Sequence, residues 1–122
     1  MADKKQYITQ IAENGNVLIS EDVIATIALH SLEDIDGYAG LSSKYTGDLV
    51  ELLNAKNWGK GIRVYISEKN DVTVECNIVV FYGYSVMTVA DAIQEAVLAA
   101  VNSCTGIQLE SVNINICGIA KK

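Results

Sequence analysis

The 122-residue chain lacks proline, has a single histidine and contains few aromatic residues, which make up 7% of the sequence. Without proline, its turns have no ready cis peptide bond and depend on glycine and asparagine. Its apolar runs all fall well short of the roughly 20 residues of a membrane-spanning helix. The N-terminal sequence MADKKQYITQIAENG lacks the apolar core of a signal peptide. We therefore expect a cytoplasmic protein that does not insert directly into a membrane.

Positive charge is also scarce. Nine Lys and Arg residues stand against 15 Asp and Glu residues, which gives a formal charge of -6. Phosphate binding requires clustered basic residues, so this balance argues against a nucleic-acid partner and against docking on anionic lipid. Hydrophobic residues make up 50% of the chain, enough for a core. We expect a single domain over residues 1–122, frayed at residues 1–5 and 120–122.

The three cysteines, Cys76, Cys104 and Cys117, are widely spaced and form no CxxC pair. An odd number at such spacings is typical of reduced thiols and not of a disulfide framework. Cys76 and Cys104 fall on the apolar sides of an expected strand and helix, so we predict that both are buried. Cys117 falls on the polar side of its strand and is the thiol that we expect to be exposed.

The first half of the chain predicts a β-hairpin followed by helices. Strands are expected at 7–11 and 17–20, joined by a type I′ turn at Asn14-Gly15. Ser20 is expected to cap a helix that ends at Gly37. A second, shorter helix is predicted over 48–55, with Leu49, Leu52 and Leu53 on its apolar side.

Alternating apolar residues predict a second hairpin, with strands at 62–67 and 72–82. The preceding Gly59-Lys60-Gly61 resembles part of a phosphate-binding loop, but it lacks the full GxxxxGK[ST] frame and leads into a strand, which favours a simple turn. A long helix is expected to begin at Thr88, with Asp91 completing a capping-box-like start, and to end at Gly106. Its apolar stripe consists of Val89, Ile93, Val97, Ala100, Val101 and Cys104.

The last expected strand, VNINICGI at 112–119, completes the order β-β-α-α-β-β-α-β. This order predicts an α+β fold, a mostly antiparallel or mixed sheet packed against two or three helices. Val112, Ile114 and Ile116 are expected to lie under the long helix. Asn113, Asn115 and Cys117 form the opposite side of the strand, which we interpret either as an interaction surface or as a tolerated polar face.

Residues with catalytic or metal-binding chemistry are few. His30 lies beside the apolar stripe of the first helix, and the sequence supplies no partner that would make it a general base. Glu33, Asp34 and Asp36 cluster near the end of that helix without the spacing of a calcium loop, which favours a solvated acidic face. We therefore predict no catalytic residues, no cofactor and no metal site.

The segments NVLISEDVIATIA, DGYAGLSS, LVELLNAKNWGKGIRVYI, VECNIVVFYGYSV, VADAIQEAVLAAVNSCTG and ESVNINICGI, in this order, resemble the alkaline shock protein family. This family includes general-stress and envelope-stress proteins of Gram-positive bacteria. The resemblance runs from about Val17 to Ile119, and the chain is similar in size to the short housekeeping branch. It implies a non-enzymatic protein that associates with itself and with a membrane-anchored partner, located in the cytoplasm or peripherally at the membrane through that partner.

The sequence and the resemblance leave three candidate functions. An interaction or scaffold protein agrees with the resemblance and with a sheet that has free edges. A regulatory domain linked to fatty-acid synthesis would instead bind a metabolite in an apolar pocket between the long helix and the sheet. An enzyme has the least support, because the sequence shows no nucleophile paired with a base.

Overall fold

The computed structural model describes residues 7–42 and 61–121. Its elements follow the order β1 (Tyr7–Ala12), β2 (Gly15–Ser20), α1 (Glu21–Ser31), β3 (Tyr38–Leu41), β4 (Ile62–Ile66), β5 (Val72–Phe81), α3 (Val86–Thr105) and β6 (Ser111–Ala120). The predicted α+β class is confirmed. The helix predicted over 48–55 and the Gly59-Lys60 part of the expected turn lie outside the described residues.

The main sheet is built around β5. β3 and β4 both pair antiparallel with β5, and β6 pairs with it in parallel, so the sheet is mixed. β3 and β4 follow each other along one edge of β5, because β3 meets Ile78–Val80 and β4 meets Val72–Cys76. β6 takes the other edge over its whole length and forms the margin of the sheet among the described strands.

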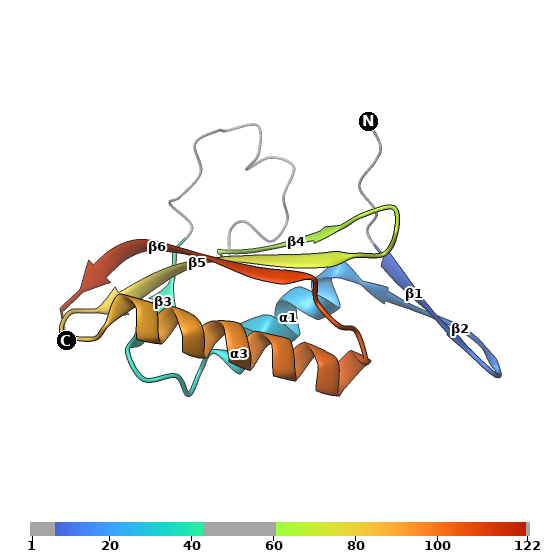
Figure 1. Ribbon diagram of the computed structural model, residues 1–122, viewed down its shortest axis with the longest axis horizontal. Helices are drawn as coiled ribbons and strands as arrows, with labels where there is room; N and C mark the ends of the chain where they lie inside the picture. The colour runs from blue at the N-terminus through green and yellow to red at the C-terminus, as the bar shows by residue number, and fades with distance from the viewer. Residues whose placement is uncertain (1–6, 43–60, 122) are drawn as a thin grey trace.

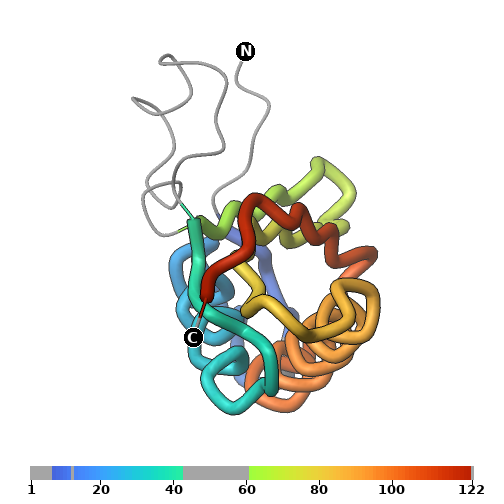
Figure 2. Tube along the Cα trace, turned by 90° about the vertical axis from the view of Figure 1, so that its left-hand side faces the viewer, coloured from blue at the N-terminus to red at the C-terminus, as the bar shows by residue number. Residues whose placement is uncertain are grey.

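Both described helices cover one face of the sheet, and the core lies between the two layers (Figures 1 and 2). The alternation predicted for β4 and β5 is confirmed, since every second side chain is buried against the helices: Ile62, Val64, Ile66, Val72, Val74, Cys76, Ile78 and Val80. Val89, Ile93, Val97 and Val101 of α3 are also buried, as predicted. Removing this apolar surface from water is the main force that holds the layers together.

The N-terminal hairpin forms as predicted, but its turn is shifted by one residue. Ala12 pairs with Gly15, so Glu13 and Asn14 are the two turn residues and the type I′ turn at Asn14-Gly15 is wrong. Gly15 instead has a φ of 135°, which favours glycine there. The base of the hairpin is fixed to the body, because Ile8 is buried and Gln10 Nε2 donates to the Thr105 carbonyl over 3.1 Å. Beyond this base the hairpin projects from the molecule (Figure 1).

The predicted C-terminal end of the first helix is wrong. Ser20 caps α1 by accepting from the Val23 N–H, but the helix ends at Ser31 with Leu32 as its C-cap. The acidic residues that follow disfavour further helix, because they would lie at the negative end of its dipole. Gly37 does adopt a positive φ of 89°, but it serves the turn into β3. β3 was not predicted from the sequence, because its four residues YAGL show no alternation.

The long helix begins earlier than predicted. Its N-cap is Ser85, whose Oγ accepts from the Thr88 N–H over 3.3 Å, so Thr88 lies inside the first turn. Gly106 ends the helix as predicted, with a φ of 77°. The burial predicted for Cys104 is wrong: Cys104 is exposed. The buried residues follow a four-residue spacing, and Thr105, not Cys104, continues that row after Val101.

Candidate interaction surfaces

The outer face of the sheet, which points away from the helices, carries a polar cluster across three strands. Strand alternation directs Tyr65 of β4, Glu75 and Asn77 of β5, and Asn115 of β6 to this face. The register places them side by side, because Tyr65 pairs with Thr73 next to Glu75, and Asn115 pairs directly with Asn77. We call these four residues the outer-face cluster.

Asn115 is the centre of the outer-face cluster. Its Nδ2 donates to Glu75 Oε2 over 2.8 Å and to Asn77 Oδ1 over 2.9 Å. The Tyr65 hydroxyl donates to the other carboxylate oxygen of Glu75 over 3.1 Å. The Arg63 guanidinium lies over the Tyr65 ring, 5.0 Å from its centroid, and adds a cation–π contact. The cluster thus joins β4, β5 and β6 through side chains as well as through the backbone.

Asn77 is completely buried, although its side chain lies on the outer face. Its Nδ2 has no hydrogen-bond partner in the part of the chain that the structure describes. Its backbone connects the two strands on the same edge of β5, since Asn77 N donates to Gly61 O and Asn77 O accepts from Ser42 N, each over 2.8 Å. Asn77 therefore holds the end of β3 and the start of β4 on the same edge of β5.

The three residues singled out in the sequence are separated by the structure. Asn115 is half-buried within the outer-face cluster, whereas Asn113 is exposed and takes no part in it. Cys117 is half-buried at a bulge, where β6 has one extra residue opposite the Ile78/Val79 step of β5. Burial raises the pKa of the Cys117 thiol, against a backbone hydrogen bond from Ile78 that lowers it. These features do not make Cys117 a reactive thiol.

Tyr65, Glu75 and Asn77 were not predicted from the sequence as members of a site. The alternation of β5 places Glu75 and Asn77 on the face opposite its buried side chains, so the face they share could be predicted from the sequence. The neighbours across the sheet depend on the pairing of β5 with β6, two strands separated by a helix. That long-range register cannot be deduced from local periodicity.

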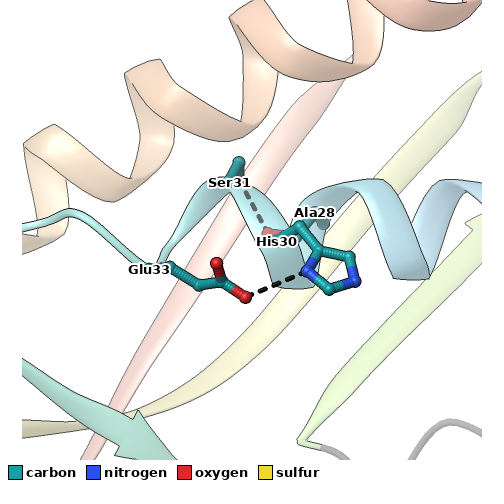
Figure 3. Close-up of polar contacts among 4 residues, drawn as sticks. All are labelled: Ala28, His30, Ser31 and Glu33. Carbon is teal, nitrogen blue, oxygen red and sulfur yellow. Dashed lines mark hydrogen bonds and ion pairs between the residues drawn. The ribbon is translucent and has the colours of Figure 1, made fainter.

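His30 lies in the last turn of α1, with its Nδ1 2.9 Å from Glu33 Oε2 (Figure 3). Both side chains are largely exposed, at 65% and 64%, so water screens this contact. Within the described ranges, 7–42 and 61–121, the acidic, histidine and cysteine residues form no group able to hold a metal ion.

A surface groove of about 580 Å³ lies between the loop after α1 and the start of α3. It is lined by Asp34, Ile35, Asp36, Tyr84, Ser85, Thr88, Val89 and Ala92. Two carboxylates in an otherwise mixed lining disfavour an anionic ligand.

The projecting hairpin carries a group of exposed apolar side chains. Tyr7, Ile11 and Leu18 point to the same side, because alternate residues of paired strands share a face, and their exposures are 51%, 85% and 60%. Val17, on the other side near the tip, is 53% exposed. Such grouping on a small element is typical of a surface that contacts another protein. Neither described helix is long and apolar enough to cross a membrane.

The model of the alkaline shock protein 23 family, described as having a cell envelope-related function, matches residues 9–121. The chain is 33% identical over 107 residues to the uncharacterized protein YloU of Bacillus subtilis (strain 168), covering 86% of this chain and 88% of that one. It is 30% identical over 105 residues to YqhY of the same organism, covering 86% and 77%.

A stress response regulator gls24 homolog of Streptococcus pyogenes (serotype M3, strain MGAS315) is 29% identical over 112 residues, which cover 91% of this chain and 62% of that protein. Among solved structures, one titled MamM-CTD H264A superimposes with a TM-score of 0.47 and 18% identity, over 80% of this chain and 96% of that one. At this level the structural likeness carries no conclusion about function.

Proposed function

The chain belongs to the alkaline shock protein 23 family, and from this premise we propose that it is a non-enzymatic interaction protein of the envelope or general stress response. In this proposal it associates with itself and binds a membrane-anchored protein. It is located in the cytoplasm and reaches the membrane through that partner. The description of the family as envelope-related and the stress-regulator name of a relative support the proposal.

The projecting hairpin is the observation that carries partner binding. Four of the ten large hydrophobic side chains that are exposed among the described residues belong to β1 and β2. A partner that covers Ile11 and Leu18 would remove this apolar surface from water, which stabilises a complex by about 25 cal/mol per Å² before the costs of association. The acidic charge of the rest of the chain would direct a basic juxtamembrane segment of the partner toward it.

Fractionation of the native cell tests this proposal. We expect the wild-type chain to sediment with membranes, and Ile11→Glu to move largely to the soluble fraction because a charge would be buried in the complex. Tyr82→Glu is a matched control, since Tyr82 is 72% exposed but lies outside the hairpin. A wild-type chain found wholly in the soluble fraction, or equal membrane binding by Ile11→Glu and wild type, would contradict it.

The alternative function, a regulatory domain for an acyl-derived metabolite, receives less support. It requires an apolar pocket between the long helix and the sheet. The groove described above lies elsewhere, at the start of α3, and Asp34 and Asp36 in its wall would repel the phosphate or carboxylate of such a ligand. A rise in the melting temperature of the protein with saturating acyl-coenzyme A would support the metabolite-binding function.

A further inference from the structure

We propose that two copies of this chain pair through β6, antiparallel and edge to edge, so that their sheets become continuous. This inference rests on the self-association in the proposed function and assigns a site to it. β6 is the longest strand at a margin of the described sheet, and its second edge has no described neighbour. An exposed edge offers unpaired N–H and C=O groups to another strand.

The hydrogen bonds of β5 establish which backbone groups of β6 point outward. Asn77 bonds to Gly61 and Ser42, so the odd-numbered residues of β5 direct their N–H and C=O groups toward β3 and β4. Val72 O accepts from Glu110 N, so the even-numbered residues face β6. In a parallel pair of strands, only one of two directly opposite residues points its N–H and C=O groups at the other strand. The residues of β6 that lie opposite even-numbered residues of β5 therefore point their N–H and C=O groups away from β5.

These outward residues are Val112, Ile114, Ile116 and, after the bulge, Ile119. Two contacts confirm the pattern. The outward C=O of Val112 is already used, because it accepts from Gln94 Nε2 of α3 over 3.0 Å. The inward C=O of Ala120 accepts from Tyr82 N over 2.7 Å. The open part of the edge therefore begins at Ile114.

β6 carries neither charge nor proline, two of the features that usually block an exposed edge, and its bulge at Cys117 lies after Ile114 and Ile116. Its sequence SVNINICGIA contains no charged residue and no proline, whereas natural edge strands commonly carry lysine, proline or inward-pointing charges. In a chain with a net charge of -6, two copies repel each other over most of their surfaces. A ten-residue strip without charge is where this repulsion is least.

Charged residues stand at both ends of this strip and favour the antiparallel arrangement of two copies. Glu110 directly precedes β6 and Lys121 directly follows it, and both are exposed. They lie about 33 Å apart along the strand, too far to meet within one chain. Antiparallel pairing brings Glu110 of each copy beside Lys121 of the other, twice by symmetry. Parallel pairing would place Glu110 beside Glu110.

The register that aligns these charges has its two-fold axis at Asn115. Ile114 of one copy then faces Ile116 of the other, which forms about four backbone hydrogen bonds from groups without a partner among residues 7–42 and 61–121. Because Cys117 is an extra residue in the strand, Lys121 of one copy lies opposite Glu110 of the other copy in this register. The bulge limits pairing beyond Ile116, so the paired segment is short. The strength of the dimer therefore also depends on the surfaces beside the paired segment.

The flank of α3 next to this edge adds apolar surface. Gln94 reaches β6, and Met87 and Leu98 lie on the same stripe of the helix, seven residues before and four residues after it. Met87 is 69% exposed and Leu98 is 38% exposed, and Ile119 on the same margin is 54% exposed. Two-fold pairing would bring these apolar residues toward their counterparts.

A charge-swap cycle measured by sedimentation velocity at low salt tests this site. We expect the wild type to dimerise and both Glu110→Lys and Lys121→Glu to raise the dissociation constant roughly tenfold, because each places like charges together twice. The double variant Glu110→Lys/Lys121→Glu restores opposite charges and should return to within about twofold of the wild type. The single variants change the net charge from -6 to -4 and to -8, so a general charge effect would move them in opposite directions.

Residue-resolved amide exchange supplies a second readout. The Ile114 and Ile116 amides should exchange more slowly as the concentration rises, whereas the Leu18 amide in the hairpin should not change. Single variants that associate like the wild type, or Ile114 and Ile116 amides whose exchange is independent of concentration in a dimer, would overturn the β6 site and leave self-association intact. A wild type that stays monomeric would instead contradict self-association in the proposed function.

Discussion

Asn113 and Asn115 are two residues apart on the same face of β6, yet their surroundings differ. Asn115 donates both of its Nδ2 hydrogens, to Glu75 and to the buried Asn77. Asn113 is exposed. A buried acceptor that loses its donor carries a desolvation cost that an exposed amide does not. The outer-face cluster therefore stabilises the association of β4, β5 and β6 through side-chain hydrogen bonds.

We expect Asn115→Ala to lower the free energy of unfolding by about 1–2 kcal/mol, because Asn77 Oδ1 and Glu75 Oε2 lose a donor. Asn113→Ala is the matched control and should change it by less than about 0.5 kcal/mol. Urea denaturation of the two variants beside the wild type measures both values. Equal effects of the two substitutions would show that the cluster does not contribute to stability.

The buried thiol of Cys76 makes stability depend on alkaline pH. Burial, with a smaller effect of Glu75, raises the pKa of Cys76 from 9.0 to about 12. Above about pH 9 the unfolded chain releases this proton and the folded chain retains it, so stability is lost as the pH rises toward 12. Between about pH 8 and pH 10.5 this group should lower the free energy of unfolding by about 2 kcal/mol.

Cys76→Ala should remove that part of the pH dependence, whatever its effect at neutral pH. Cys104→Ala, which changes an exposed thiol, should keep it. Urea denaturation at both pH values gives the two differences. The same loss of stability in Cys76→Ala and in the wild type would exclude Cys76 as its source.

At the scale of elements, capping decides where α3 begins. The sequence predicted Thr88 as the N-cap, because Asp91 follows it three residues later. In the structure Ser85 has an extended backbone, with φ −73° and ψ 119°, and caps the helix. The three residues after Ser85 thus form the first turn, which adds Val86 and Met87 to the helix before Thr88.

Ser85→Ala should therefore destabilise the protein by about 1 kcal/mol, the usual cost of losing an N-cap. Thr88→Ala should have a smaller effect, because the hydroxyl of Thr88 is not the cap. Thermal unfolding followed by circular dichroism compares the two variants. A larger loss in Thr88→Ala would favour the helix start predicted from the sequence.

Local patterns predicted most elements of the fold, and long-range contacts account for the rest. The alternation of β4 and β5 and the four-residue stripe of α3 are local, so their buried residues could be identified. β3 has only four residues, and it forms because Phe81 N donates to Gly37 O and Ser42 N to Asn77 O. Neither contact leaves a sequence signal. The outer-face cluster was missed for the same reason, since it depends on the register between β5 and β6.

At the scale of the whole molecule, α1 and α3 cover one face of the sheet (Figure 1) and leave distinct surfaces elsewhere. The hairpin projects at one end of the molecule (Figure 1) and carries exposed apolar side chains, and β6 forms a margin of the described sheet. These surfaces are separate, so one copy could bind a partner and a second copy at once. Two separate binding surfaces of this kind let a small protein assemble a larger complex.

Sedimentation equilibrium of the wild-type chain over a broad concentration range measures its molar mass and thereby tests self-association. We expect the molar mass to rise from 13.2 kDa toward twice that value as the concentration increases. A mass that stays at 13.2 kDa at every concentration would contradict it.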